Sequence, residues 1–274
     1  MPYRQAHYFI ALTFLVIVIG FWGSYFQPFN SVPLAFHVHA VTAMAWVLLL
    51  LFQHWSIHNR KRQLHRTAGL LSLVLFPFLI TGFVMIVNTS AVAFIESEER
   101  GAFSLGPSFG LSMLFAIIAY LVLYYRALRH KRNVFLHSGY MLTTALVLFE
   151  SPFSRIMLKY LPFMIFTGSE FPLRILDAIA ISMGLSIAFA VAMYVRDRKH
   201  ATPFLVAAGL MTMQAISMLA GAHSEWVRDA FRLYAAIPDG VTIVAGFLLG
   251  AIVSWVGFRH SRAGPTVTPA TVSG

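Results

Sequence analysis

Cysteine is absent from this sequence of 274 residues. Without thiols the chain cannot form disulfides, thiolate zinc sites, iron–sulfur clusters or a covalent haem attachment through a cysteine pair. Charge is also scarce, because Asp, Glu, Lys and Arg make up only 11% of the residues, against roughly 25% in a soluble domain. Hydrophobic residues make up 58%, and the mean hydropathy is +0.74. This composition predicts an integral membrane protein.

Several sequence signatures of catalysis are missing as well. The chain has no H-E-x-x-H zinc motif and no G-x-S-x-G nucleophile motif. The clustered histidine boxes of membrane di-iron desaturases do not occur, and no lysine falls in the middle of an apolar run, where a retinal Schiff base would form. No familiar enzyme class is therefore indicated by a motif.

Long apolar runs fill most of the chain. About 20 residues at 1.5 Å per residue cross the hydrocarbon core of a bilayer, and eight runs are long enough. The predicted fold is an all-α bundle of about eight transmembrane helices in one membrane domain over residues 1–260, followed by a disordered cytoplasmic tail over 261–274. We place the helices at 8–26, 34–56, 68–88, 106–126, 136–157, 173–195, 203–221 and 240–258.

Basic residues gather in alternate loops, and most acidic residues fall on the opposite side. By the positive-inside rule, this distribution places both termini in the cytoplasm. It also accounts for the net charge of +10, so we predict the lipid bilayer as the partner and no nucleic acid. The residues on the basic side are Arg4, Arg60, Lys61, Arg62, Arg66, Arg126, Arg129, Lys131, Arg132, Arg196, Arg198, Lys199, Arg259 and Arg262.

The acidic side carries two longer loops, around 89–105 and 222–239. The second loop can form a short helix with one apolar face, which predicts a helix lying in the outer membrane interface. An ordinary structured loop is the alternative. The apolar face consists of Trp226, Ala230, Leu233 and Tyr234.

Histidines within the apolar runs are the first candidate site residues. A spacing of seven residues keeps His39, Trp46 and Gln53 on one helix face, from which His37 points away. A histidine inside a span is costly unless it is paired, so we predict that His39 faces other helices and serves a function there. The alternative is an imidazole that only fixes helix packing through a hydrogen bond.

A short internal repeat in the sequence places further histidines at the basic ends of the helices. KRQLHRTAGL (61–70) and KRNVFLHSGYM (131–141) share a basic loop, then a leucine followed by a histidine, then a small residue. His65 and His137 therefore stand at similar depth at the entrances of the third and fifth helices. Similar depth is a precondition for sharing one ligand, although any histidine near the basic boundary would also show it.

The fifth helix carries an ionisable group near each of its ends. Eighteen residues make five turns, so His137 and Arg155 share a helix face roughly 27 Å apart. An unpaired guanidinium there would be costly. We expect Arg155 to pair with Asp177 of the sixth helix, or with Glu150 of another copy.

These residues resemble the sequence blocks of a family of uncharacterised bacterial multipass membrane proteins, a domain of unknown function. The resemblance covers roughly residues 34–157 and implies the bacterial inner membrane, but no activity. The lysine or arginine that often follows His137 in that family is missing here, which weakens a phosphate or propionate contact at this position. The histidine layout is also loosely similar to the haem-binding four-helix cytochrome b proteins. The matching blocks are H-x6-W-x6-Q (His39, Trp46, Gln53), H-R-x-x-G (His65, Arg66, Gly69) and H-x3-M-x13-R (His137, Met141, Arg155).

The first functional hypothesis is a redox protein that carries haem b or works with a quinone or another redox partner. His65 and His137 would be axial ligands on the inner side, and His39 would serve an outer site with His223 as its partner. The predicted cofactor-binding residues are His39, His65, His137, Arg66, Met141 and Arg155, and the predicted metal ligands are His39, His65, His137 and His223.

Three alternatives remain open at this point. A metal-dependent membrane enzyme would gather His39, His223, Glu150 and Asp177 around zinc or iron and activate water. A small-solute or proton transporter would use His39, Asp177 and Arg155 as an intramembrane relay. In a scaffold protein, these polar residues would only fix the packing of the helices.

Overall fold

The computed structural model describes residues 2–161 and 171–260, and the predicted tail over 261–274 lies outside this part of the chain. Its elements are the helices α1 (Ala6–Phe21), α2 (Leu34–His58), α3 (Arg62–Glu99), α4 (Gly106–Arg129), α5 (Val134–Tyr160), α6 (Phe171–Arg196), α7 (Thr202–Gly221), α8 (Glu225–Ala235) and α9 (Asp239–Arg259). A π-helical turn over Trp22–Phe26 extends α1, and a short 3-10 turn follows at Phe29–Ser31. No β-strand occurs among the described residues, which confirms the all-α prediction.

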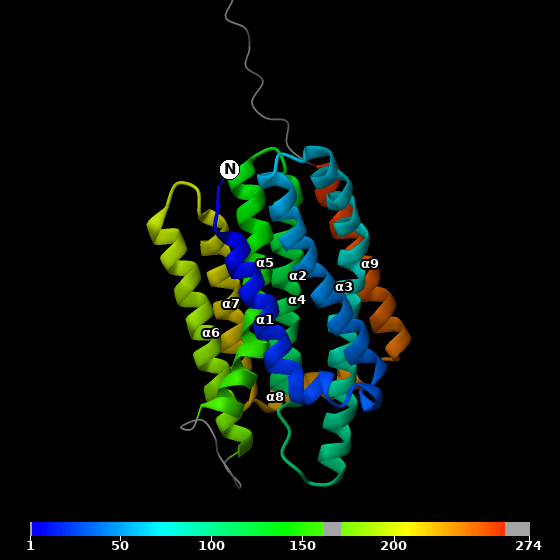
Figure 1. Cartoon of the computed structure of the whole chain (residues 1–274). Coiled ribbons are helices and arrows are strands. Elements are labelled where there is room, and N and C mark those ends of the chain that lie inside the picture. Colours follow the sequence, from blue (N-terminus) through cyan, green and yellow to red (C-terminus); the bar gives the residue numbers. More distant parts are fainter. Residues whose placement is uncertain (1, 162–170, 261–274) are drawn as a thin grey trace, which may run out of the picture.

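All of these helices except α8 are long and apolar enough to cross a membrane, so the structure contains the eight predicted spans. The bundle is compatible with a multi-pass membrane protein. Figure 1 shows the start of α1 and the end of α9 at the same end of the bundle. The connections from α2 to α3, α4 to α5 and α6 to α7 reverse the chain at that end, which we call the basic end. The connections from α1 to α2, from α3 to α4 and from α7 through α8 to α9 lie at the opposite end, which we call the acidic end.

The centre of the bundle is formed by α3, α4 and α5. The helix α4 packs against α3, α5, α7 and α9, and α1 and α2 flank this group. Aromatic side chains fill the space between the central helices, since Trp46 and Phe76 are 0% exposed and the rings of Phe76 and Tyr124 stack with their centres 4.1 Å apart. The Trp46 indole N–H donates to the Thr144 hydroxyl at 2.9 Å, which satisfies its only polar group inside the core.

Small residues allow α9 to approach the central helices closely. A Cβ atom added at Gly250 would lie 2.7 Å from the Cα of Pro77 in α3, and one added at Gly246 would lie 2.8 Å from Val84. Close backbone approach through glycine is a common way to pack helices in lipid, where apolar contact alone gives little drive for association. These close contacts of Gly246 and Gly250 were not among the sequence-based predictions.

The acidic end of α3 differs from the expectation of a loop over 89–105. Helix α3 continues to Glu99 because this stretch contains no glycine or proline before Gly101, and its glutamates are good helix formers. Gly101 then ends the helix with a φ of +64°, a left-handed conformation that glycine adopts without strain. At about 1.5 Å per residue the 38 residues of α3 span roughly 57 Å, which exceeds the thickness of a bilayer core.

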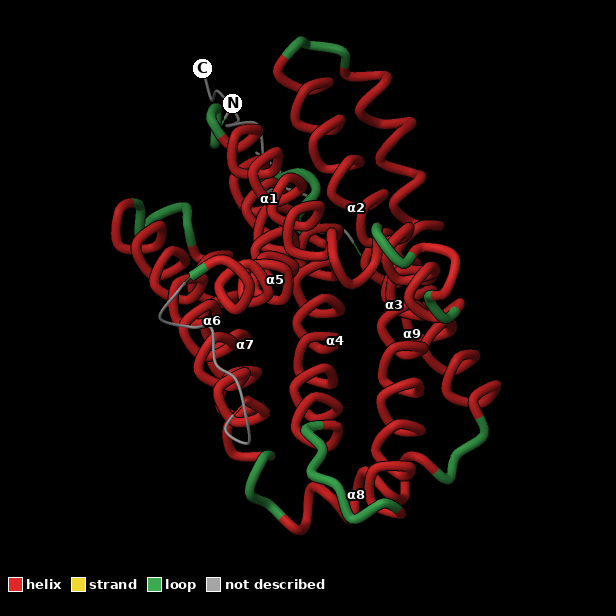
Figure 2. Tube along the Cα trace, turned by 60° about the horizontal axis from the view of Figure 1, so that its bottom comes forward, coloured by secondary structure: helices red, strands yellow, loops and turns green. Residues whose placement is uncertain are grey.

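The second longer loop does contain the predicted short helix. Both views place α8 at the end of the bundle opposite the N-terminus, beside the ends of the long helices (Figures 1 and 2). Val227 and Phe231 form the buried face of α8, and Phe231 packs against Phe94 of α3. Of the predicted apolar face, Trp226 and Leu233 point outward, at 72% and 74% exposed, whereas Tyr234 is half-buried against the bundle.

Candidate functional site

His65 of α3 and His137 of α5 meet inside the basic end of the bundle. Their ring centres lie 6.5 Å apart and the ring planes are nearly perpendicular, at 88°. Each histidine stands near the start of its helix, and both helices start at the same end of the bundle. The start of α5 is fixed by Asn133, whose side chain accepts a hydrogen bond from the N–H of Leu136 at 3.2 Å. The two imidazoles therefore lie at the same level along the bundle, as the internal repeat of the sequence predicted.

The hydrogen bond of His137 defines which of its nitrogens is free. Its Nδ1 lies 2.8 Å from the backbone oxygen of Ala127 in α4. Because a carbonyl can only accept, Nδ1 carries the proton, and the lone pair of the neutral ring lies on Nε2. A ring nitrogen that donates to a carbonyl while the other keeps its lone pair is the usual arrangement of a metal-binding histidine.

Polar atoms around this pair are buried and lack partners. The His65 ring lies beside the backbone carbonyl of Gln53 in α2, but its Nδ1 has no hydrogen bond. The side-chain oxygen Oε1 of Gln53 is also buried and without a partner. Buried polar groups in proteins are almost always satisfied, so these atoms mark a place where a bound group would complete the bonding.

A second polar group lies in the acidic half of the bundle, around His39 of α2. Its ring packs on Phe83 of α3 with centres 4.8 Å apart, and a Cβ atom at Gly82 would lie 2.8 Å from the His39 Cα. The Nδ1 of His39 is buried and has no hydrogen-bond partner. The helix face that carries His39 and Trp46 thus turns toward other helices. His37 lies off this face, and its Nδ1 is 3.1 Å from the hydroxyl of Tyr25.

Arg155 of α5 belongs to this second group. Its guanidinium donates to the backbone oxygen of Ser151 at 2.9 Å and to the Ser151 hydroxyl at 2.7 Å, and it covers the ring of Phe21 at 4.6 Å. Its positive charge also acts on His39 and on Glu150 of its own helix. Asp177, the carboxylate expected to pair with it, lies on an exposed side of α6.

The predicted site residues therefore fall into two groups in opposite halves of the bundle. Of the remaining candidates, Arg66 and His223 are exposed, and Met141 is half-buried and packs against the core. Within residues 2–161 and 171–260, no set of three or more His, Asp or Glu side chains is placed to hold a metal ion. The metal-dependent enzyme hypothesis thus gains no support.

Sequence reasoning missed a bonded polar network that ties α8 to α3. Glu98 accepts hydrogen bonds from Arg228 at 2.9 Å and from the Nε of Arg232 at 2.8 Å. The Glu98 carboxylate raises the pKa of Arg232 above its usual value. Nearby, the Asn88 side chain accepts from Tyr234 and donates to Thr242 of α9 at 2.8 Å. The opposite charges of the two longer loops were the available signal for the ion pairs.

Comparison with known proteins gives no indication of function. No protein-family model matches it, no curated protein matches it, and no solved structure matches it. The resemblances to a family of uncharacterised membrane proteins and to cytochrome b remain predictions. The function is therefore argued from the two groups of polar residues.

Proposed function

We propose that this chain is a multi-pass protein of the bacterial inner membrane, with its basic end in the cytoplasm. The support is the distribution of charge over the fold. Arg60, Lys61, Lys131, Arg132 and Lys199 all belong to connections at the end that holds the start of α1. The positive-inside rule assigns such an end to the cytoplasm, and both termini with it.

We further propose that His65 and His137 hold haem b and that the protein transfers electrons. The observation that supports this most is the 6.5 Å separation of the two ring centres. A metal about 2 Å from one nitrogen of each ring separates the ring centres by roughly 6 Å. The free Nε2 of His137 and the unpartnered Nδ1 of His65 are the atoms that would ligate the iron.

The number of available ligands favours haem over a bare metal ion. Protein zinc sites use three or four side chains, whereas the described residues offer only the two histidines at this place. Haem brings four nitrogen ligands of its own and needs only axial ligands from the protein. Because the chain has no cysteine, the haem would be held without covalent bonds, as in b-type cytochromes.

The residues around the pair define what the protein contributes. Haem b supplies one-electron chemistry when it is bound. The carbonyl of Ala127 holds the His137 ring in the tautomer whose Nε2 would ligate, and the backbone carbonyl of Gln53 lies beside the His65 ring. The pair lies half-buried at one end of a bundle of apolar helices, a position from which it would exchange electrons with a membrane-soluble quinone or another redox partner.

The visible spectrum of the purified full-length protein tests the haem proposal. We expect a Soret band that is lost in His65→Ala and in His137→Ala, with iron and protein present in equal amounts in the wild type. His200→Ala is the matched control, because His200 lies at the same end but interacts with Asp197 at 3.1 Å. Circular dichroism of each variant checks that the helices are retained. A wild-type protein without a Soret band and without iron would overturn the proposal.

The second group of polar residues favours a second candidate function, proton or small-solute transport. His39 has a buried unpartnered nitrogen, and the charge of Arg155 acts on both His39 and Glu150, so ionisable groups of two helices share the acidic half. Such a group is a candidate relay inside a membrane. Proton flux into proteoliposomes tests it, and flux that is unchanged in His39→Ala would exclude His39 from a relay.

A further inference from the structure

The ends of α4 and α9 meet at the basic end of the bundle, in a region that we call the α4–α9 corner. Lys131, just after α4, donates from its Nζ to the backbone oxygen of Phe258 at 2.8 Å, and this Nζ lies 3.6 Å from the centre of the Phe258 ring. Arg259, the next residue of α9, holds its guanidinium over the ring of Trp255 at 4.3 Å. Two cations from distant parts of the chain are thus held against the end of α9.

Close packing of α9 on α4 fixes this corner. A Cβ atom added at Gly257 of α9 would lie 3.1 Å from the Cβ of Leu128 and 3.3 Å from the ring of Tyr125, both in α4. The Tyr125 hydroxyl accepts a hydrogen bond from the guanidinium of Arg129 at 3.1 Å, which adds a third cation beside this contact. Because helix packing sets the positions of these charges, a ligand meets them already in place.

The positive charge of the corner is not paired with a carboxylate within residues 2–161 and 171–260. Asp197 is the only acidic residue in the three connections at the basic end, and it interacts with His200 at 3.1 Å. Both belong to the connection after α6, and Figures 1 and 2 place α6 and α9 on opposite sides of the bundle. Burial and the neighbouring charge of Arg132 lower the pKa of Lys131, as expected for an ammonium group without a negative partner.

An exposed apolar stripe of α9 leads to this corner. Leu248, Ile252 and Trp255 are each more than half exposed, and their spacing of four and three residues places them on one helix face. Arg259 follows four residues later on the same face. From Leu248 to Arg259 the helix advances roughly 16 Å, which is about the depth of one leaflet of the hydrocarbon core. The stripe and the corner together suit an acyl chain that carries an anionic headgroup.

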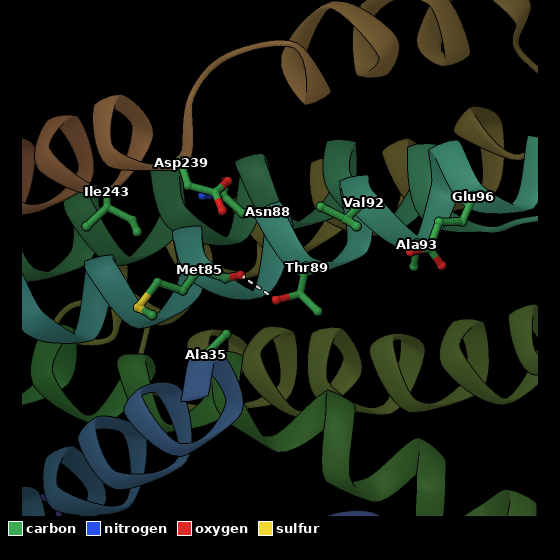
Figure 3. A pocket seen from close by; sticks show the side chains of 9 residues that line it. All are labelled: Ala35, Met85, Asn88, Thr89, Val92, Ala93, Glu96, Asp239 and Ile243. Carbon is green, nitrogen blue, oxygen red and sulfur yellow. Dashed lines mark hydrogen bonds between the residues drawn. The ribbon is translucent and has the colours of Figure 1, made fainter. Parts of the chain in front are cut away.

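The acidic end offers the opposite kind of surface. Figure 3 shows a groove along the outer part of α3 in which Glu96 and Asp239 lie well apart, with Val92 between them. Glu96 lies 3.9 Å from Arg100, and none of the residues that line the groove is basic. Carboxylates repel an anionic headgroup, so the charge of the bundle favours such a headgroup at the basic end.

We propose that the α4–α9 corner binds the phosphate of an anionic phospholipid in the leaflet at the basic end, with Lys131 as the donor and an acyl chain along the exposed face of α9. An ammonium group has three N–H donors, and the carbonyl of Phe258 takes one, so Lys131 keeps donors for a phosphate oxygen. Arg259 and Arg129 add electrostatic attraction. The inference rests on the proposed membrane location and is independent of the haem.

Native mass spectrometry of the purified full-length protein in a neutral detergent tests the charge requirement. With lipids of equal acyl length, the wild type should retain phosphatidylglycerol at least fivefold more strongly than zwitterionic phosphatidylethanolamine. Lys131→Gln should weaken apparent phosphatidylglycerol binding about fivefold and leave phosphatidylethanolamine unchanged. Lys131→Arg, which keeps the charge, should bind like the wild type. A wild type without preference for phosphatidylglycerol would overturn the proposal.

A matched control separates this corner from the basic boundary as a whole. Lys61 also lies at the basic end over an aromatic ring, with its Nζ 4.4 Å from the centre of the Trp55 ring. Lys61→Gln should keep the preference for phosphatidylglycerol, whereas the double variant Lys131→Gln/Arg259→Gln should lose it. A loss in Lys61→Gln as large as in Lys131→Gln would overturn the assignment to this corner. Carbonate extraction tests membrane insertion and the Soret band tests the haem, so a failure of either proposal is read separately from lipid binding.

Discussion

At the basic end of the bundle, His65 and Gln53 each hold a buried polar atom without a hydrogen-bond partner, whereas at the acidic end Glu98 accepts hydrogen bonds from two arginines. Both ends bring polar side chains from several helices together. The charge-assisted bonds of Glu98 stabilise the position of α8, although the Nε of Arg228 has no partner. An unsaturated group costs free energy until a ligand completes it. We therefore assign a structural role to the bonds of Glu98 and expect a ligand at His65 and Gln53.

The largest expected effect comes from comparing one variant at each end of the bundle by the same two measurements, haem content and protease resistance. His137→Ala should reduce the ratio of haem to protein, measured by the pyridine haemochrome method, to background, because the variant removes one of the two proposed iron ligands. The same variant should leave the region 222–239 as resistant to protease as in the wild type. Glu98→Ala should give the reverse result on both measurements. A loss of haem in Glu98→Ala as complete as in His137→Ala would remove the distinction between the ends.

The next largest effect concerns Gln53. In the cofactor-free protein, Gln53→Leu should raise the free energy of unfolding by about 1 kcal/mol, because the variant removes a buried oxygen that has no partner. Equilibrium unfolding in mixed micelles measures this change. Destabilisation of the cofactor-free protein would show that Gln53 Oε1 is satisfied in the membrane and that the basic end is not poised for a ligand.

A smaller and local effect is expected for Glu98→Gln. The neutral amide keeps some hydrogen bonds to Arg228 and Arg232 but loses the charge, so α8 should open more often while the spans stay folded. Hydrogen exchange of the α8 amides should become several-fold faster, and high salt should speed exchange in the wild type. Unchanged exchange would mean that the buried Val227 and Phe231 and the bond of Tyr234 to Asn88 hold α8 in place without the charge of Glu98.

The smallest effect is a pH dependence at Tyr234. Burial raises the pKa of this phenol, and Asp239 raises it further. The folded protein therefore holds the proton more tightly than the unfolded chain, and the contribution to stability is present below about pH 10 and is lost as the pH rises through the raised pKa. Ultraviolet titration of tyrosinate in wild type and Tyr234→Phe measures this. A difference spectrum that titrates at the ordinary tyrosine pKa would contradict it.

Much of the bundle could be predicted from the sequence because lipid imposes a simple pattern. Each apolar run must satisfy its backbone hydrogen bonds internally, so the runs become helices at the predicted places. The shared depth of His65 and His137 followed from their position after each basic loop. The inward direction of His39 followed from its spacing to Trp46.

Other features depend on contacts between helices that one sequence does not display. The carbonyl of Ala127 is a backbone group, and no residue type signals that it will receive His137. The fit of Gly250 against Pro77 requires knowing that α9 packs on α3. Arg155 bonds to Ser151, four positions earlier in its own helix, whereas the sequence-based expectation was a carboxylate from another helix or another copy of the chain.

The length of α3 has a consequence for how the protein meets membranes of different thickness. This one helix carries His65 near its basic end and is fixed to α8 and α9 through Glu98 and Asn88 near the other. A bilayer that thins or thickens can tilt peripheral helices at modest cost. The distance from His65 to the acidic-end anchor is set by a continuous helix and does not follow the lipid. The position of the histidine pair is thus set by its distance along α3 from the acidic end of the protein.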